Sequence, residues 1–183
     1  NSKLEQIVRK LGIDYKEFEE ASQFYTAVSP FFPDLDHVVD FCAGNGLNGI
    51  NWHLHGKTNR VTYVDIKQNK HYNLLQEALD LPGDAYLTCG VDDFNRRASA
   101  FFSIHACGDL TDRIINKAIY SFTSFAVMPC CYNFRENGLL PQEVLENLDS
   151  KKDALDAVRA YKIIQAGYDL HIREIDSSVT PYN

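Results

Sequence analysis

Cysteine and histidine side chains that could do chemistry gather in two short stretches, HACGDLTD and MPCCYN. Cys130 and Cys131 are adjacent, whereas zinc ligands usually lie two to four residues apart, so they are poorly spaced for joint chelation. A site that also uses His105 and Cys107, a thiolate nucleophile at Cys130 and a vicinal disulfide are three further interpretations. The pattern favours a fourth, in which small, polarisable side chains shape a pocket. We therefore expect no metal site.

A glycine-rich stretch, VVDFCAGNGLNG, has the pattern G-x-G-x-x-G at Gly44, Gly46 and Gly49. It lies between a strand-like and a helix-like segment, which is the context that a nucleotide cofactor requires. Asp40 lies four residues before the first glycine. Its carboxylate would repel the pyrophosphate of a dinucleotide, but it would attract the cationic sulfonium and ammonium groups of S-adenosylmethionine (SAM). The pattern favours SAM over NAD, and a tight turn without a ligand is the remaining alternative.

Acidic residues also follow the next two apolar runs. Asp65 ends RVTYVDI, where a carboxylate can accept hydrogen bonds from both ribose hydroxyls of a nucleoside. Capping of the following helix is the alternative. CGVDDF offers Asp92 and Asp93 to the amino group of an adenine; we prefer Asp92, with a solvated turn as the alternative. These residues are consistent with a nucleoside ligand, but they do not distinguish SAM from a dinucleotide such as NAD.

The elements that must position these residues alternate between short apolar runs and helical patterns. Continuous apolar runs are typical of strands buried on both faces, and their alternation with helices predicts a parallel sheet. The fold class is therefore α/β, a doubly wound and mostly parallel sheet that binds ligands beyond the carboxyl ends of its strands. The expected strands are 37–41, 60–66, 85–90, 100–106, 124–130 and 168–175, and the expected helices are 2–28, punctuated at Gly12, 48–56, 69–80, 111–122 and 141–166.

The chain of 183 residues is long enough for one sizeable core. We divide it into an N-terminal helical segment, 1–35, and a SAM-binding domain, 36–183. The aromatic N-terminal helix either covers the cofactor as a lid or packs against the sheet.

Two motifs carry a family resemblance. D-x-x-x-G-x-G resembles the first motif of class I SAM-dependent methyltransferases. H-A-C-G-x-x-T-D followed by P-C-C-Y resembles a methyltransferase-like subgroup, which includes a region of the glutathione S-transferase C-terminal domain-containing protein and certain tRNA ribose 2′-O-methyltransferases. The resemblance covers roughly residues 36–133 and, more weakly, VTPYN. It implies a Rossmann-like methyltransferase fold, of which the antiparallel last strand is expected to be missing or trimmed.

The resemblance also implies roles for individual residues. Thr111 and Asp112 start a helix, where capping explains them equally well. The cofactor would contact Asp40, Ala43, Gly44, Asn45, Gly46, Asp65, Ile66, Asp92, His105 and Ala106, and the substrate pocket would be formed by Cys107, Gly108, Pro129, Cys130, Cys131 and Tyr132.

Methyl transfer from a sulfonium has a good leaving group, so the protein mainly supplies proximity and orientation. A poorly acidic acceptor such as a hydroxyl benefits from a base. His105 is the first choice because the ordinary pKa of histidine lies near neutral pH, and a structural histidine is the alternative. Asp109 is the second choice of base, and Cys130 is a further catalytic candidate as a nucleophile.

Charge and cysteine count limit the partners. The net charge of −7 disfavours a broad cationic surface for nucleic acid. The adjacent basic pairs at 96–97 and 151–152 are expected to be solvated surface. Five cysteines, an odd number, predict reduced thiols and a cytoplasmic location, and no apolar run is long enough for a membrane span.

We therefore expect a SAM-dependent methyltransferase with an open acceptor class: RNA, protein or a small molecule. The alternatives are a non-catalytic binding module with the SAM fold and an NAD-dependent oxidoreductase.

Overall fold

A parallel sheet forms the middle layer of the protein, which we describe from a computed structural model covering residues 2–81, 85–129, 141 and 150–180. The order β3-β2-β1-β4-β5 reverses direction between β1 and β4, and such a switch point is where α/β sheets bind ligands. The predicted doubly wound α/β fold is confirmed. The strands, all parallel, are β1 (Val38–Phe41), β2 (Val61–Asp65), β3 (Ala85–Thr88), β4 (Ala100–Ser103) and β5 (Ser124–Val127).

Both faces of the central strands are buried, as the apolar runs predict. All four residues of β1 are buried, and alternate residues point to opposite faces of a strand. Val38 accordingly belongs to one apolar cluster, and Val39 and Phe41 belong to the other. Asp40 shares the face of Val38, so a carboxylate enters the first cluster at the end of the strand.

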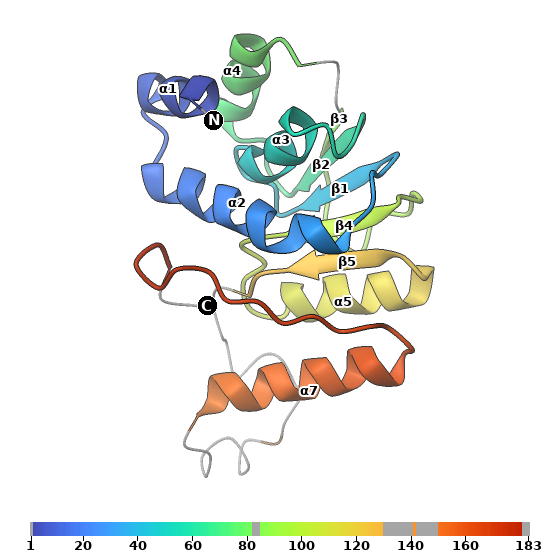
Figure 1. The fold of residues 1–183 in the computed structure, drawn as a ribbon. Helices are drawn as coiled ribbons and strands as arrows, with labels where there is room; N and C mark the ends of the chain where they lie inside the picture. The colour runs from blue at the N-terminus through green and yellow to red at the C-terminus, as the bar shows by residue number, and fades with distance from the viewer. Residues whose placement is uncertain (1, 82–84, 130–140, 142–149, 181–183) are drawn as a thin grey trace.

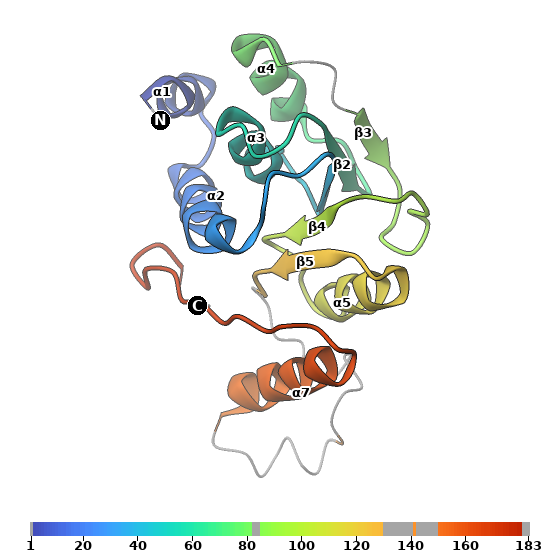
Figure 2. The ribbon, with the colours of Figure 1, turned by 45° about the vertical axis from the view of Figure 1, so that its right-hand side comes forward.

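Helices cover the two faces unequally (Figures 1 and 2). Gly12, at φ 66°, separates the two N-terminal helices, and the Asp14 side chain caps the second by accepting from Lys16 N at 3.0 Å. The first face carries α1 (Ser2–Leu11), α2 (Tyr15–Val28), the short η1 (Ser29–Phe31), α3 (Leu47–Leu54) and α4 (Lys70–Leu79), and the second carries α5 (Leu110–Ser121) with α7 (Lys151–Gln165) outside it.

The N-terminal helices share the core of the sheet. Phe24 of α2 meets Phe102 of β4 edge-on, with ring centroids 6.4 Å apart. Trp52 of α3 stacks on the same Phe102 ring at 4.1 Å, and Tyr25 approaches Trp52 edge-on. Such aromatic pairs add to the area that the helix buries, so α2 is fixed over the edge where β1 and β4 end.

The C-terminal segment differs from the sequence expectation. Residues 168–175 form no strand, so the predicted sixth strand is wrong. The segment runs past the β5 side of the sheet toward α2, as the dark red trace in Figures 1 and 2 shows. Individual side-chain contacts hold the segment. Tyr168 donates to the carbonyl of Ala118 at 2.9 Å, and His171 stacks on Phe31. Within the expected helix 141–166, the described part is helical over 151–165.

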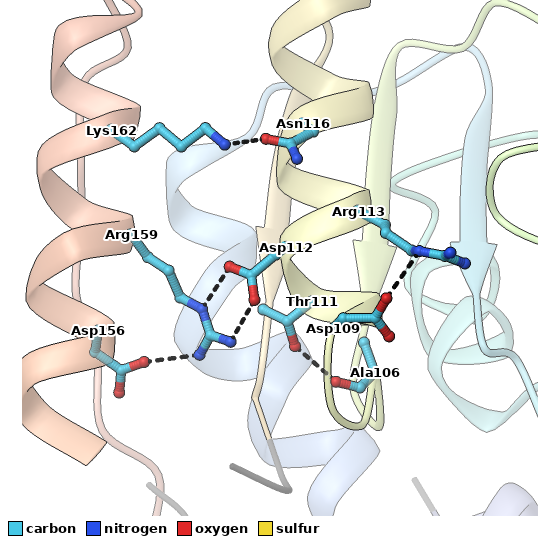
Figure 3. Close-up of polar contacts among 9 residues, drawn as sticks. All are labelled: Ala106, Asp109, Thr111, Asp112, Arg113, Asn116, Asp156, Arg159 and Lys162. Atoms are coloured by element: carbon cyan, nitrogen blue, oxygen red, sulfur yellow. Dashed lines mark hydrogen bonds and ion pairs between the residues drawn. The ribbon is translucent and has the colours of Figure 1, made fainter. Parts of the chain in front are cut away.

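A buried ion pair joins α5 to α7 (Figure 3). The Arg159 guanidinium of α7 donates from Nε and Nη2 to both carboxylate oxygens of Asp112 on α5, each at 2.9 Å. Both side chains are buried. Asp112 therefore attaches α7 and is not a cap of α5. No helix in the described parts of the chain is long and apolar enough to cross a membrane.

We predict that Arg159→Met destabilises the fold by about 3–5 kcal/mol, because it leaves the Asp112 carboxylate buried and unpaired. The double variant Asp112→Leu/Arg159→Met should recover most of that loss. Urea unfolding measures both. Arg113→Met is the control, since Arg113 is half exposed in its pair with Asp109, and such pairs contribute about 0–1 kcal/mol. An Arg159→Met variant as stable as this control would contradict the prediction.

Candidate functional site

The loop from β1 to α3 turns sharply at the switch point. Three of its residues have left-handed backbone angles: Cys42 at φ 55°, Gly44 at φ 53° and Gly46 at φ 85°. Glycine adopts this conformation without strain, whereas a cysteine does so at a cost of about 1–3 kcal/mol. Backbone hydrogen bonds hold the turn, from Ala43 N to Val64 O at 3.2 Å and from Gly46 N to Ala43 O at 2.7 Å. The first two glycines of the motif therefore shape the loop.

The third glycine brings α3 close to the sheet. A Cβ atom on Gly49 would lie 2.6 Å from Tyr63 Cε1 and 2.7 Å from Val61 Cγ1. Only hydrogen fits between the helix and β2 at this point. The third glycine of the motif is thus needed for the packing of α3 against β2, in addition to any role in letting the backbone approach a ligand.

Asp40 binds the amino end of α3. Its Oδ1 accepts from Asn48 Nδ2 at 2.7 Å, and its Oδ2 accepts from the backbone N–H of Gly49 at 3.0 Å. The residue is only 1% exposed. Burial raises the pKa of Asp40 to about 7, against the opposite effect of these two hydrogen bonds, and the negative charge of Asp65 raises it further. The carboxyl group therefore changes charge near neutral pH.

Asp65 and Tyr86 hold the same loop from the neighbouring strands. Gly44 N donates to Asp65 Oδ2 at 3.0 Å, and Lys67 N donates to Oδ1 at 3.4 Å. The Tyr86 hydroxyl donates to Gly44 O at 3.0 Å and lies 3.2 Å from Lys67 O. Burial, and then the charge of Asp65, raise the pKa of Tyr86 to about 12, so it remains a donor. Asp65 thus positions the glycine loop.

A hollow of about 150 Å³ lies where β1 and β4 end, and α2 forms its outer wall. This volume is below the roughly 300–1,000 Å³ of typical ligand pockets. Burial raises the pKa of the Cys42 thiol in its wall to about 12, so this thiol stays protonated and unreactive. The lining residues are Glu17, Ala21, Asp40, Cys42, Ala43, Gly44, Asn45, Leu47, Asn48, Asn69, Ile104 and His105.

Two acidic side chains of α2 contact residues in the wall of the hollow. Glu20, itself buried, lies with Oε2 3.0 Å from His105 Nε2 and with Oε1 3.6 Å from Lys16 Nζ. Glu17 accepts a hydrogen bond from Asn45 in the glycine loop. One helix therefore contacts both the β1 loop and the β4 loop.

The hollow brings together five residues of the sequence-predicted site: Asp40, Ala43, Gly44, Asn45 and His105. Among the other cofactor residues, Gly46 is the N-cap of α3, Asp65 binds the loop from behind, Ile66 is 80% exposed, and Ala106 is buried in the second apolar cluster.

Arg113 holds both remaining acidic candidates: Asp92 at 3.2 Å and Asp109 at 3.0 Å. The Asp109 pair is drawn in Figure 3, as is the hydrogen bond from the Thr111 hydroxyl to Ala106 O at 2.6 Å. Neither carboxylate lines the hollow.

Only some of the residues predicted for the substrate pocket lie within the described ranges. Cys107 is exposed, Gly108 has φ 63° and precedes α5, and Pro129 follows β5. None of these three lines the hollow. Cys130, Cys131 and Tyr132 lie outside the described residues. Within the described ranges, no group of three His, Cys, Asp or Glu side chains could hold a metal ion.

Sequence reasoning missed four polar residues of the site. Glu17 and Glu20 belong to α2, where an acidic residue on the buried side of an amphipathic helix is a usable signal. Asn48 lies inside the glycine motif, at one of its variable positions. Asn69 is the N-cap of α4, and its side chain accepts from His71 N at 2.9 Å; the helix start predicts the cap but not its place beside the hollow.

The comparison with known sequences gives partial matches. No family model matches the chain. The glutathione S-transferase C-terminal domain-containing protein homolog of Drosophila pseudoobscura pseudoobscura is 33% identical over 102 residues, 53% of this chain and 17% of that protein. The human protein is 31% identical over 107 residues, 56% of this chain and 16% of that protein. The chain thus spans about a sixth of the length of these curated relatives.

The comparison with solved structures gives the fold. Geranyl diphosphate C-methyltransferase from Streptomyces coelicolor A3(2), solved with Mg²⁺, geranyl diphosphate and S-adenosyl-L-homocysteine, is similar with a TM-score of 0.53 and 15% identity. The match covers 80% of this chain and 58% of that chain. The protein therefore has the Rossmann-like fold of class I methyltransferases. The sequence likeness to the glutathione S-transferase C-terminal domain-containing protein is confirmed, and the roles assigned to the motifs remain predictions.

We predict that Gly49→Ala destabilises the protein by about 1–3 kcal/mol, since the added methyl group overlaps Tyr63 and Val61. Gly90→Ala is the matched control, because its Cβ would meet only the movable Asp93 carboxylate at 3.0 Å. Chemical denaturation compares the two variants. Equal stability of Gly49→Ala and the unsubstituted protein would show that α3 can move away from β2.

Proposed function

We propose that the protein is a SAM-dependent methyltransferase that binds the cofactor in the hollow beyond β1 and β4. One observation carries the proposal: an acidic hollow lies at the switch point of a class I methyltransferase sheet, beside a left-handed glycine loop. SAM is a nucleoside with a cationic sulfonium and an ammonium group, so its charge complements these acidic walls. When bound, it supplies an electrophilic methyl group.

The donor set of the hollow suits a cation. The carboxyl groups of Asp40 and Glu17 line it, and Glu20 lies directly behind its His105 wall. The Asn48 side chain, 6% exposed, gives its NH₂ group to Asp40, and its buried Oδ1 has no hydrogen-bond partner. The carboxyl groups of Asp40 and Glu17 would attract the ammonium and sulfonium groups of SAM.

His105 is the proposed base for an acceptor hydroxyl or amine. Glu20 accepts at Nε2, so that nitrogen carries the proton and Nδ1 presents its lone pair. The negative charge of Glu20 also stabilises the imidazolium that forms when Nδ1 takes a proton. His105 is 43% exposed, so an acceptor can approach from solvent. RNA, protein and small molecules remain the acceptor classes.

A non-catalytic binding module is the second candidate function. One observation favours it: the hollow is small, and Glu17 and Glu20 connect α2 to the wall residues Asn45 and His105. Such a module would bind SAM, or a partner surface, without transferring a methyl group. Labelled methyl transfer into separated RNA, protein and metabolite pools of a cell extract distinguishes the two, since only an enzyme labels a pool. An NAD-dependent oxidoreductase is disfavoured by the Asp40 carboxyl at the glycine loop.

We predict that SAM affinity rises with pH between about 5.5 and 7.5. The pKa of Asp40 is about 7 without ligand, and a cation prefers the ionised carboxylate, so below that pH a proton must be lost on binding. The dependence approaches tenfold per pH unit well below the pKa. Isothermal titration with Asp40→Asn should show weaker binding and most of the slope lost. Asp36→Asn, an exposed change of the same charge, should behave like the unsubstituted protein. Tight NAD binding without SAM binding would contradict the proposal.

We predict that Glu20→Gln lowers kcat about 10–100-fold for an acceptor that must lose a proton, because the imidazolium loses its counter-charge. The KM for SAM should change little. A loss of kcat with an unchanged KM for SAM is a change that a purely structural role would not produce. His105→Gln should lower kcat at least as much as Glu20→Gln. An unchanged kcat in both variants would remove His105 from the chemistry.

A further inference from the structure

A second hollow lies at the opposite end of the sheet. It measures about 260 Å³ and is formed where β1, β2 and β3 begin. Strands of four to five residues separate it from the first hollow, which corresponds to roughly 15 Å at about 3.3 Å per residue. The two hollows share no residue. The second is lined by His37, Arg60, Val61, Thr62, Ala85, Arg96 and Arg97.

The charged side chains that line this hollow are positive. Arg60, Arg96 and Arg97 are exposed and line it, and none of the described residues that line it carries a carboxylate. In the parts of the chain that the structure describes, none of the three guanidinium groups forms an ion pair. The whole chain carries a net charge of −7, so three cations around one cavity are a local excess of positive charge. Without a ligand they repel one another, and a bound anion would remove that repulsion.

The floor of the hollow is rigid. His37 is buried, its Nδ1 donates to Arg97 O at 3.2 Å, and its Nε2 accepts from the Thr62 hydroxyl at 2.8 Å. Backbone bonds add to this, with Ser99 N donating to His37 O at 2.8 Å. The segment that carries Arg96 and Arg97 is therefore attached to the starts of β1 and β2. The backbone of Arg97 is thereby fixed beside the strand starts, so binding has to order only the exposed arginine side chains.

His37 itself is an uncharged part of the site. Burial lowers the pKa of its imidazole, and the positive charges of Arg60 and Arg96 lower it further. The ring therefore stays neutral at physiological pH with both nitrogens in use. The arginines alone supply the positive charge of the hollow, and that charge does not change over the physiological range because guanidinium groups do not titrate there.

We propose that this second hollow binds the terminal phosphate group of a small phosphorylated molecule. A guanidinium group presents N–H donors in a planar fork that matches phosphate oxygens, and such charge-assisted bonds are about twice as strong as neutral ones. Three forks from Arg60, Arg96 and Arg97 suit the several oxygens of a phosphate dianion. The cavity volume exceeds that of one phosphate, which leaves room for the group that the phosphate is attached to. The proposal is independent of the function of the first hollow.

The test is a titration of the full chain with inorganic phosphate and with adenosine 5′-monophosphate at constant ionic strength, followed by calorimetry or ³¹P NMR. Both ligands should bind, and Arg60→Gln/Arg96→Gln/Arg97→Gln should weaken binding at least tenfold. The control Arg9→Gln/Lys10→Gln/Arg173→Gln removes the same charge elsewhere and should leave the affinity unchanged. Circular dichroism and the unfolding temperature check that both triple variants are folded.

Three outcomes would overturn the proposal. The first is absence of phosphate binding, and the second is equal binding by the two triple variants. The third distinguishes the source of the phosphate: a single-stranded oligoribonucleotide without terminal phosphates binds through the same arginines while phosphate and the mononucleotide do not. In that case the hollow recognises a nucleic-acid backbone and not a small molecule.

Discussion

The hydrogen bonds of Asp40 connect the end of β1 to the start of α3, and the geometry of the candidate site depends on them. Two N–H donors, one from the Asn48 side chain and one from the Gly49 backbone, hold the carboxyl group in a buried position. The positive end of a helix dipole favours its ionised form, while burial opposes it and raises its pKa to about 7. The close approach of α3 to the sheet at Gly49 keeps these donors within reach. Asp40 is thus both the structural anchor of α3 and the proposed binding group for the cationic cofactor.

The rest of the site adds charge and closure around this anchor. Asp65 holds the glycine loop from β2, and Glu17 and Glu20 approach from α2, which is fixed in the core through Phe24. The same sheet carries opposite charges at its two ends. Carboxylates gather beyond the carboxyl ends of β1 and β2, and arginines gather before the amino ends of β1 to β3. A cationic nucleoside and an anionic group would therefore be drawn to different ends of the molecule.

The sequence predicted the sheet well because buried parallel strands are continuous apolar runs, and it predicted the first junction because Asp40 and the glycines have fixed spacing. It failed at 168–175, where an apolar-polar alternation resembles a strand. Ile172 is 69% exposed there, and no strand within the described ranges pairs with the segment. Contacts such as Glu20 with His105 join residues 85 positions apart, and no local pattern reports them. The same holds for Arg60, which only the fold brings beside Arg96 and Arg97.

The most direct test of the account is the ionisation of Asp40, measured by ¹³C NMR of its side-chain carboxyl carbon with and without SAM. We expect a pKa near 7 in the free protein and a decrease of more than about one unit with SAM bound, since one unit corresponds to about 1.4 kcal/mol of preference for the charged form. A pKa near the ordinary value of aspartate in the free protein, or one that SAM leaves unchanged, would contradict the claim that this buried carboxyl group recognises the cationic cofactor.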